Sequence, residues 1–492
     1  MPFVVAAGYD TGVIDFDDYE RRFDPSWRPR RRWARLVRTA VALVAIVALG
    51  VVVVPRYAGY LRERAAPPEQ RPPLGSVDLY GGVRGGAPPG SGIPGPTRQP
   101  LPDRAEAAAA AQRLLKQRAD SILRKDEAAF LATVDPRARA YHGAQRRLFR
   151  RLLKMPFASY DYRAFEADEA LRATRSRFDP DPVYVPLVEA RYRFRDGETT
   201  PVLNALRYVF VRTPDGWRIG GEERSRPGDH HHQELWDSGT VEVLRGGRTL
   251  VAFHAASRSL ARRLLDAAEG GYDDVDAAWG GDWDHQVAIM VPSSEAEAEK
   301  IAGVKDISAA AAVAATSIEP GPVDKILAAR IVVNPAIGRY DELNLRVVVT
   351  HEMTHVATRS VGTAVPMFLV EGFADFAALR SVDLPLRSTR PTLARAVSSG
   401  QFDGKLPTES VFDLKAADDR SRALAYDEGS TFCLWVERTW GLDAIRALYH
   451  SFAGVDGPAT QDLINRKVRE VLGISFSTAQ SRWAAFVRAN LR

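Results

Sequence analysis

The motif H-E-M-T-H at residues 351–355, with a glutamate further on, constrains most strongly how this chain can fold. Two histidines four residues apart share one face of a helix, with Cβ atoms about 5–6 Å apart. At that spacing both imidazoles can reach one tetrahedral zinc ion at about 2.0–2.1 Å. A hydrolytic zinc site needs a third protein ligand and an open position for water, and Glu371 is the natural third ligand beside His351 and His355. The motif therefore predicts two packed helices around one metal ion.

The helix that carries the motif also supplies a candidate base. Glu352 lies between the histidines, where its carboxylate can take a proton from a metal-bound water. We expect this helix to begin just before the motif, with Asp341 or Asn344 as its cap. The run 347–349 consists of β-branched valines, which mildly favour a strand. The ligand spacing needs a helix, and burial can outweigh propensity, so a helix is predicted.

A second helix is expected over about 367–380, because Pro366 suits a first helical turn. On this helix Glu371 and Asp375 would share a face. Asp375 could then accept a hydrogen bond from the second ring nitrogen of a zinc-bound histidine and fix its tautomer. A solvated helix acid is the alternative interpretation. Gly372, beside the ligand, would let this helix approach the motif helix closely.

These residues resemble a known group, the gluzincin zinc peptidases, which include thermolysin-like and aminopeptidase-like enzymes. H-E-M-T-H is followed after fifteen residues by E-G-F-A-D, and P-M-F-L-V-E-G-F-A-D is similar to P-x-W-L-x-E-G-x-A, with Phe368 where Trp is usual. The resemblance covers residues 235–492 and implies a zincin-like α+β metallopeptidase domain that binds Zn²⁺. The site residues that it implies are the ligands His351, His355 and Glu371 and the base Glu352.

The same resemblance bears on substrate binding. A-Y-D-E-G-S-T-F at 425–432 is similar to the segment that carries the aminopeptidase-like tyrosine. Tyr426 is therefore a candidate to stabilise the tetrahedral intermediate through its hydroxyl, with a core tyrosine as an equal alternative. A G-x-M-E-N segment, which holds a free amino terminus in such aminopeptidases, is missing, so exopeptidase activity is in doubt. The strand expected at 330–335 is either an edge strand that pairs with extended substrate or an ordinary buried strand.

An apolar run near the N-terminus predicts a membrane anchor. Residues 40–54 contain no polar side chain, and with Leu36 and Val37 the apolar zone approaches the length that spans a bilayer. Eight arginines lie between 21 and 38 and three follow soon after, which places the N-terminus in the cytoplasm. We expect a basic cytoplasmic tail at 1–35 and a single-pass signal-anchor helix at 36–55. The alternatives are a cleaved signal peptide, for which no A-x-A site follows, and a buried soluble helix.

The composition narrows the class of protein. Lysine occurs nine times against 58 arginines, a bias typical of high-GC bacteria, and no nucleic-acid-binding motif is found. The formal charge of +5 is small for 492 residues.

The single cysteine, Cys433, allows no intrachain disulfide, and we expect it to be a buried small side chain in a helix.

The chain divides into further segments. Residues 65–103 contain ten prolines and predict an extended stalk. Residues 104–226 begin with helices and continue with alternating strands, joined at 213–216 by a hairpin turn, a pattern that resembles the cone-shaped SnoaL-like domains. Ligand binding, regulation and simple spacing all stay open for this part. The histidines at 230–232 indicate a solvated linker or a weak metal site.

Together these features predict a membrane-anchored zinc peptidase that acts on a peptide or protein, with its C-terminal domains outside the cell. Alternating strands and helices ahead of the motif, and helices from about 422 onward, fit an α+β upper half and a helical lower half. The alternative is a catalytically inactive zincin-fold scaffold or binding protein. Residues 381–420 are a candidate lid over the cleft. The substrate and the oligomeric state are not predicted.

Overall fold

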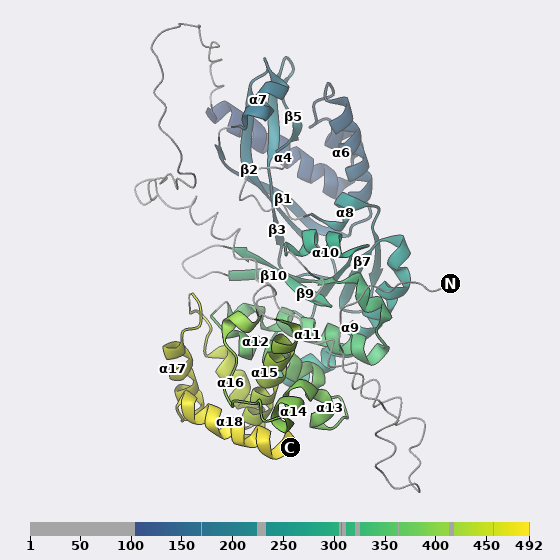
Figure 1. Ribbon diagram of the computed structural model, residues 1–492. Coiled ribbons are helices and arrows are strands. Elements are labelled where there is room, and N and C mark those ends of the chain that lie inside the picture. The colour runs from purple at the N-terminus through teal and green to yellow at the C-terminus, as the bar shows by residue number, and fades with distance from the viewer. Residues whose placement is uncertain are drawn as a thin grey trace, which may run out of the picture.

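The computed structural model of this protein describes residues 104–168, 170–223, 233–304, 307, 311–319, 325–362, 364–412, 418–455 and 457–491. The predicted tail, membrane helix and stalk, and the histidines at 230–232, lie outside the described residues. Among the residues that are described, no helix combines the length and apolar character needed to cross a membrane. The described chain has a mixed α/β architecture, with an N-terminal part, a central mixed sheet and a C-terminal helical part stacked in that order (Figure 1).

The N-terminal part consists of helices followed by an antiparallel sheet, as predicted. Helix α4 begins the described chain and is rich in alanine, the strongest helix former, with Ala107, Ala111 and Leu114 on its buried face. It packs against β1. The elements are α4 Arg104–Arg124, α5 Glu127–Leu131, α6 Arg139–Leu152, β1 Phe157–Asp168, α7 Arg172–Phe178, β2 Val183–Phe194, β3 Val202–Leu206, β4 Tyr208–Thr213 and β5 Gly216–Glu222. The resemblance to cone-shaped domains stays a prediction.

The sheet of this part follows the order β1-β2-β4-β5, and β3 also pairs with β2. All of its pairings are antiparallel. The expected hairpin is confirmed, because Thr213 at the end of β4 pairs with Gly216 at the start of β5. Aromatic side chains fill the space between sheet and helices: Phe130, Phe149, Tyr192 and Phe210 are fully buried.

The central sheet combines parallel and antiparallel strands in the order β6-β7-β8-β10-β9. Strands β7, β8 and β10 run parallel, while β6 and β9 pair antiparallel at the two edges. The central strand β8 is apolar on both faces, which is typical of parallel strands covered on both sides. The elements of this region are α8 Leu235–Ser238, β6 Glu242–Arg245, β7 Thr249–Phe253, α9 Arg258–Trp279, β8 Val287–Val291, α10 Glu295–Ala302, β9 Ala312–Glu319 and β10 Lys325–Val333.

The predicted strand 330–335 needs a correction. It forms the end of β10, which pairs with β8 on one side and β9 on the other, so the interpretation as an edge strand is wrong. The edge strand beside it is β9, which the sequence did not reveal. Its segment A-V-A-A-T-S-I-E contains three alanines, a residue depleted in strands, among its eight residues.

The C-terminal part is helical. Helix α11, which carries the H-E-M-T-H motif, packs against α9 and α12, and α12 packs in turn against α15 (Figure 1). The elements are α11 Glu342–Thr358, α12 Met367–Leu379, α13 Leu386–Thr389, α14 Pro391–Ser398, α15 Asp419–Trp440, α16 Leu442–His450, α17 Gln461–Leu472 and α18 Phe476–Leu491. Cys433 is fully buried in α15, as expected. This packing places α11 between the sheet and the helical part.

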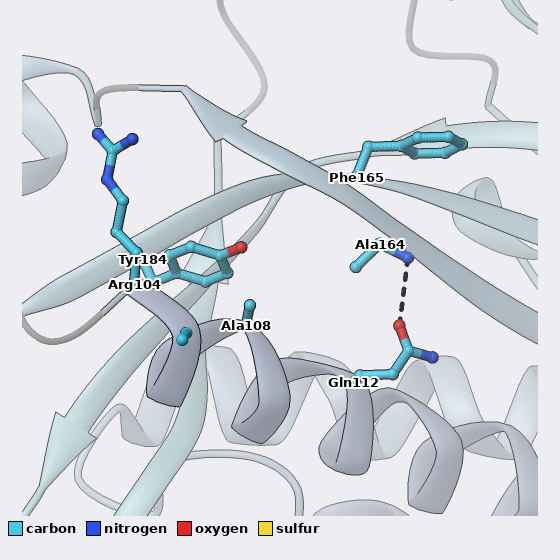
Figure 2. A pocket seen from close by; sticks show the side chains of 7 residues that line it. Arg104, Ala108, Gln112, Ala164, Phe165 and Tyr184 are labelled. Carbon is cyan, nitrogen blue, oxygen red and sulfur yellow. Dashed lines mark hydrogen bonds between the residues drawn. The ribbon is translucent and has the colours of Figure 1, made fainter. Parts of the chain in front are cut away.

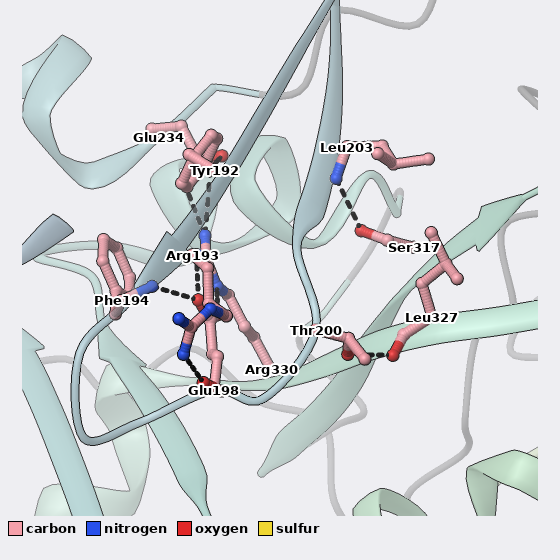
Figure 3. A network of polar contacts seen from close by, with 10 residues as sticks. All are labelled: Tyr192, Arg193, Phe194, Glu198, Thr200, Leu203, Glu234, Ser317, Leu327 and Arg330. Atoms are coloured by element: carbon pink, nitrogen blue, oxygen red, sulfur yellow. Dashed lines mark hydrogen bonds and ion pairs between the residues drawn. The ribbon is translucent and has the colours of Figure 1, made fainter. Parts of the chain in front are cut away.

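A buried polar network joins the N-terminal part to the central sheet (Figure 3). Arg330 of β10 donates hydrogen bonds from Nε and Nη2 to the carboxylate of Glu198, which lies in the β2–β3 connection, with Nη2 3.1 Å from Oε2. Its Nη1 lies 3.0 Å from the hydroxyl oxygen of Tyr192 and 3.4 Å from a carboxylate oxygen of Glu234. All four side chains are buried. The guanidinium of Arg330 therefore links side chains of the N-terminal part to the central sheet.

Two further hydrogen bonds connect the N-terminal part to the central sheet. The hydroxyl of Thr200 donates to the carbonyl oxygen of Leu327 on β10. The backbone amide of Leu203 on β3 donates to the hydroxyl of Ser317 on β9 at 3.2 Å. The N-terminal part is thus seated directly on the two strands that lie nearest the motif helix.

Candidate metal centre

The motif helix forms as the ligand spacing requires. Helix α11 begins after Asp341, whose side chain accepts a hydrogen bond from the amide of Asn344, so Asp341 is the cap. The run of valines at 347–349 is helical and buried, because the apolar face packs between the sheet and the helical part. The helix turns His351 and His355 toward each other, with the two Nε2 atoms 3.0 Å apart.

Helix α12 brings the third candidate ligand to the same point. Glu371 Oε2 lies 3.3 Å from Nε2 of His351 and 3.5 Å from Nε2 of His355. Ligand atoms about 2.05 Å from a tetrahedral zinc ion are separated by about 3.3 Å, so the three separations fit the edges of one tetrahedron. Among the described residues, this is the one group of three His, Cys, Asp or Glu side chains close enough to hold an ion.

Two glycines set the position of Glu371. A Cβ atom on Gly372 would lie 2.3 Å from the carbonyl carbon of Gly429 in α15, and one on Gly429 would lie 2.4 Å from the carbonyl oxygen of Phe368. Both separations are too short for any side chain. The expectation that Gly372 faces the motif helix is therefore wrong, because it faces α15. This backbone contact fixes Glu371, on α12, relative to Tyr426, on α15.

Asp375 lies behind the first histidine, one helical turn beyond Glu371. Its Oδ1 is 2.8 Å from Nδ1 of His351, and both side chains are buried. A proton on Nδ1 donated to this carboxylate leaves Nε2 free to bind a metal ion. The solvated-acid interpretation of Asp375 does not fit this burial. The guanidinium of Arg390, which is also buried, contributes a positive charge near Asp375.

At the three candidate ligands, burial and neighbouring charges shift the pKa in opposite directions. Burial favours the neutral form of Glu371, but His355 and His351 outweigh it and lower its pKa to about 2. Burial would lower the pKa of His351, yet its hydrogen bonds to Asp375 and Glu371 raise it well above the ordinary value. Burial dominates at His355 and lowers its pKa. An anionic carboxylate and a neutral imidazole are the ligand forms that zinc needs.

Glu352 is the candidate base and is almost fully buried. Burial raises its pKa to about 8, and the charge of Glu371 adds to this shift while that of His351 opposes it. The backbone amide of Ala314 on β9 also favours the ionised form. Within the described part of the chain, Oε2 of Glu352 has no hydrogen-bond partner. A buried polar atom without a partner indicates a site built for something else to bind there.

Tyr426 of α15 faces the same cluster. Its ring centroid lies 6.1 Å from that of His351, and its side chain is buried. Burial raises its pKa well above the usual value, and the charge of Glu371 adds to this shift. The hydroxyl lies beside the carboxylate of Glu371, a candidate ligand, and a side-chain hydrogen bond between them also raises the pKa of Tyr426, although its geometry is not that of a regular hydrogen bond. A hydroxyl that is held at the ligand cluster favours a role toward a bound ligand over simple core packing.

The candidate lid at 381–420 is only partly described. Its helices α13 and α14 pack against α15 and α18 and belong to the helical part. Phe412 reaches the ring of Tyr426, with centroids 5.6 Å apart. Residues 413–417 lie outside the described chain, so a lid role stays a prediction.

Two contributors to this site escaped sequence analysis. Arg390 lies in a segment whose composition gives no signal of a buried cation, and only the tertiary fold places it near Asp375. Ala314 contributes a backbone amide, for which no side-chain motif exists. His351 and His355 on α11, and Glu371 and Asp375 on α12, were within reach of sequence analysis because the spacing within each pair follows the helical period.

Comparisons with known proteins give limited similarity. No protein-family model matches the chain, and no curated protein matches it. Among solved structures, it is similar to a substituted M1 zinc metallopeptidase from Deinococcus radiodurans bound to a Tyr-Ser-Ala substrate, with a TM-score of 0.27 and 15% identity. A second structure of a substituted M1 zinc metallopeptidase from the same organism gives a TM-score of 0.28 and 14% identity. Each match covers 68% of this chain and 62%, less than two thirds, of the solved chain.

Proposed function

We propose that this protein is a zinc-dependent peptidase whose metal ligands are His351, His355 and Glu371. The observation that carries the proposal is the convergence of three buried ligand atoms at separations of 3.0–3.5 Å. The acid that follows the first histidine, Glu352, is buried beside them with one oxygen unpaired. A structural zinc site has no use for such an acid and usually has four protein ligands.

The residues present fit this metal and this chemistry. When bound, zinc supplies a Lewis acid that lowers the pKa of a coordinated water toward about 7. Glu352 accepts the proton of the attacking water and returns it to the leaving nitrogen. The Tyr426 hydroxyl donates a hydrogen bond to the carbonyl oxygen as negative charge develops there. Asp375 holds the Nδ1 proton of His351 and keeps the ring in the tautomer that binds through Nε2.

The substrate proposed is an extended peptide. Strand β9 is an edge of the central sheet, and its residue Ala314 lies beside Glu352. An edge strand next to a catalytic acid offers free backbone groups to an extended chain, which would pair with it as an added strand. The absence of a G-x-M-E-N segment supports internal peptide bonds over terminal ones.

The test uses metal content and hydrolysis of unfolded casein by the purified protein. Wild type should carry one zinc ion per chain and cleave casein, and a chelator should abolish cleavage. Glu352→Gln should keep zinc and lose turnover, whereas His355→Ala should lose both. The proposal fails if wild type binds no stoichiometric zinc, or if Glu352→Gln cleaves as fast as wild type. Zinc binding without any cleavage would favour the scaffold alternative.

Membrane anchoring is part of the same proposal. The apolar run at 40–54 and the arginine-rich segment before it support a single-pass anchor with the catalytic part outside the cytoplasm. Full-length protein expressed in a high-GC bacterium should stay in the membrane pellet after carbonate extraction. Added protease should cleave the C-terminal part in intact cells stripped of their wall. Release into the soluble fraction would contradict the anchor.

A further inference from the structure

The second histidine ligand lies in the last turn of α11. The helix ends at Thr358, and His355 is the basic residue of its final turn. The last four carbonyl groups of a helix lack intrahelical donors, so the final turn is the part of a helix that opens most easily. A ligand in this turn therefore keeps a fixed position only if further contacts hold the end of the helix.

The side chain of Arg359 supplies such contacts. Its Nη1 donates to the carbonyl oxygen of Val356 at 2.6 Å, in the last turn of α11, where a positive charge also suits the helix dipole. Its Nε lies 3.5 Å from the carbonyl oxygen of Leu327 on β10, and its Nη2 donates to the carboxylate of Asp284, ahead of β8. The Arg359 side chain is 12% exposed. One guanidinium thus connects the end of the motif helix to the central sheet.

The N-terminal part binds the same two acceptors. The hydroxyl of Thr199 donates to Oδ2 of Asp284, the oxygen that also accepts from Arg359. The hydroxyl of Thr200 donates to the carbonyl oxygen of Leu327, which faces Nε of Arg359 (Figure 3). Both threonines lie in the β2–β3 connection, between Phe194 and Val202. This connection therefore meets the contacts of Arg359 at two points.

The shared acceptors matter through geometry more than through charge. Asp284 is 35% exposed, and an exposed ion pair adds little stability by itself. Burial would raise the pKa of Asp284, but the hydrogen bond from Thr199 and the charge of Arg359 outweigh it and lower the pKa. The carboxylate is therefore ionised at neutral pH and accepts from both donors. Each acceptor is held by two parts of the molecule at once.

We propose that the β2–β3 connection is a positioning element of the metal centre, which acts through Arg359 on His355. This inference rests on the proposed metal site and gives the N-terminal part a role beyond spacing. The two threonines fix the acceptors, the acceptors fix the guanidinium, and the guanidinium fixes the last turn of α11. That turn holds the imidazole of His355 at its place beside His351 and Glu371.

The large cavity of the N-terminal part lies outside this path (Figure 2). It has a volume of about 510 Å³ and lies between the start of α4 and strands β1 and β2. The described residues that line it include Arg104, Phe165 and Tyr184, and none of them belongs to the β2–β3 connection or to the central sheet. A change in its wall therefore provides a control within the same part.

The test uses full-length protein in which Co²⁺ takes the place of zinc, because the visible absorption of Co²⁺ depends on the geometry of its ligands. Thr199→Val and Thr200→Val keep the side-chain size and remove the hydroxyl, and Asp284→Asn removes the charge. We expect each variant to bind Co²⁺ with altered absorption bands and to release it to a chelator about fivefold faster than wild type. The Thr199→Val/Thr200→Val double variant should show the largest change.

Two variants are matched controls. The hydroxyl of Thr213 also donates to a backbone carbonyl oxygen, that of Gly216 at 2.6 Å, in the β4–β5 hairpin. Thr213→Val should therefore lose about as much stability in urea as Thr200→Val. Phe165→Leu changes the wall of the large cavity. Both controls should keep the Co²⁺ spectrum and the release rate of wild type.

The outcomes separate this inference from the metal site itself. Thr199 is exposed, so its variant is expected to fold, which circular dichroism verifies. A wild-type spectrum and release rate in folded Thr199→Val and Thr200→Val proteins would overturn the positioning role and leave the metal site intact. The same spectral change in Thr213→Val would also overturn it, because the effect would then follow any loss of stability. Wild-type protein that binds neither Co²⁺ nor zinc would overturn the metal site and this inference together.

Discussion

The Nδ1 atom of His351 lies 2.8 Å from Oδ1 of Asp375, and both side chains are buried. This contact predicts the effect of Asp375→Asn. The amide keeps the shape but is a weaker acceptor than the carboxylate, so zinc affinity should fall by about 10–100-fold. Competition with a chromogenic chelator measures it. The control is Glu428→Gln on α15, because burial raises the pKa of Glu428 to about 9 and the group is already neutral at pH 7. Equal zinc affinity in Asp375→Asn and wild type would refute the role of Asp375.

The variant Tyr426→Phe tests whether the hydroxyl of Tyr426 takes part in catalysis or the ring only packs in the core. The buried hydroxyl makes no hydrogen bond of regular geometry with a described residue and lies beside Glu371, so its removal should change stability by no more than about 1 kcal/mol. Loss of a donor to the developing oxyanion should lower kcat by about 10²–10³ with zinc content unchanged. Tyr449→Phe is the matched control, because that buried hydroxyl donates to Thr358 at 3.2 Å. It should cost some stability and little activity. A Tyr426→Phe enzyme with wild-type kcat would show that Tyr426 only packs.

Arg330→Met should destabilise the junction between the N-terminal part and the central sheet. The change leaves the carboxylates of Glu198 and Glu234 buried without their cation. Loss of one partner from a buried ion pair costs about 3–5 kcal/mol, which urea unfolding would show. Lys116→Met is the control, because that lysine pairs with Asp120 on the surface of α4 and its loss should cost no more than about 1 kcal/mol. Equal effects of the two changes would mean that the buried network adds no stability.

The pair His254–Glu297 predicts a stability maximum at mildly acidic pH. His254 Nε2 lies 2.9 Å from Glu297 Oε1, and this hydrogen bond raises the pKa of His254 above 6.5. Its stabilisation is complete below pH 6.5 and is lost as pH rises through the raised pKa. Burial would raise the pKa of Glu297, but the hydrogen bonds from His254 and Ser293 outweigh it and lower the pKa from 4.5 to about 2.

The contribution of Glu297 is therefore complete above pH 4.5 and lost as pH falls toward 2. The pair should stabilise the fold most between pH 4.5 and 6.5, by about 1–2 kcal/mol. Urea midpoints measured across pH 3–9 test this prediction against His254→Gln. The variant should lose the decline in stability on the alkaline side of that window. If the stability of His254→Gln fell with rising pH as much as that of wild type, groups other than His254 would cause the fall.

Helix α11 shows how much of the site was accessible from sequence. Asp341 as a cap and two histidines at a separation of four residues specify both the start of the helix and the face that holds the ligands. These are local features, governed by backbone hydrogen bonding and the helical period. The valines at 347–349 favour a strand by propensity, yet they are helical. Burial, a tertiary effect, therefore decides between helix and strand where propensity is weak.

Strand β9 and Gly372 show where sequence analysis failed. The segment of β9 mixes alanines with β-branched residues, which gives only a weak strand signal, and it is a strand because β10 offers a partner along its length. Gly372 suggested a close helix contact, but the sequence could not tell that the partner is Gly429, 57 positions along the chain. Contacts between segments so far apart depend on the path of the whole chain.

The sequence by itself determined which side chains can bind a metal ion and on which helices they lie, because ligand chemistry and the helical repeat are local. Only the tertiary structure decided that Glu371 meets His351 and His355 at tetrahedral separations, that Tyr426 faces them, and that Arg330 joins the N-terminal part to β10. The physical reason is that these contacts follow from how helices and strands pack, where burial and close backbone approach select one arrangement among many.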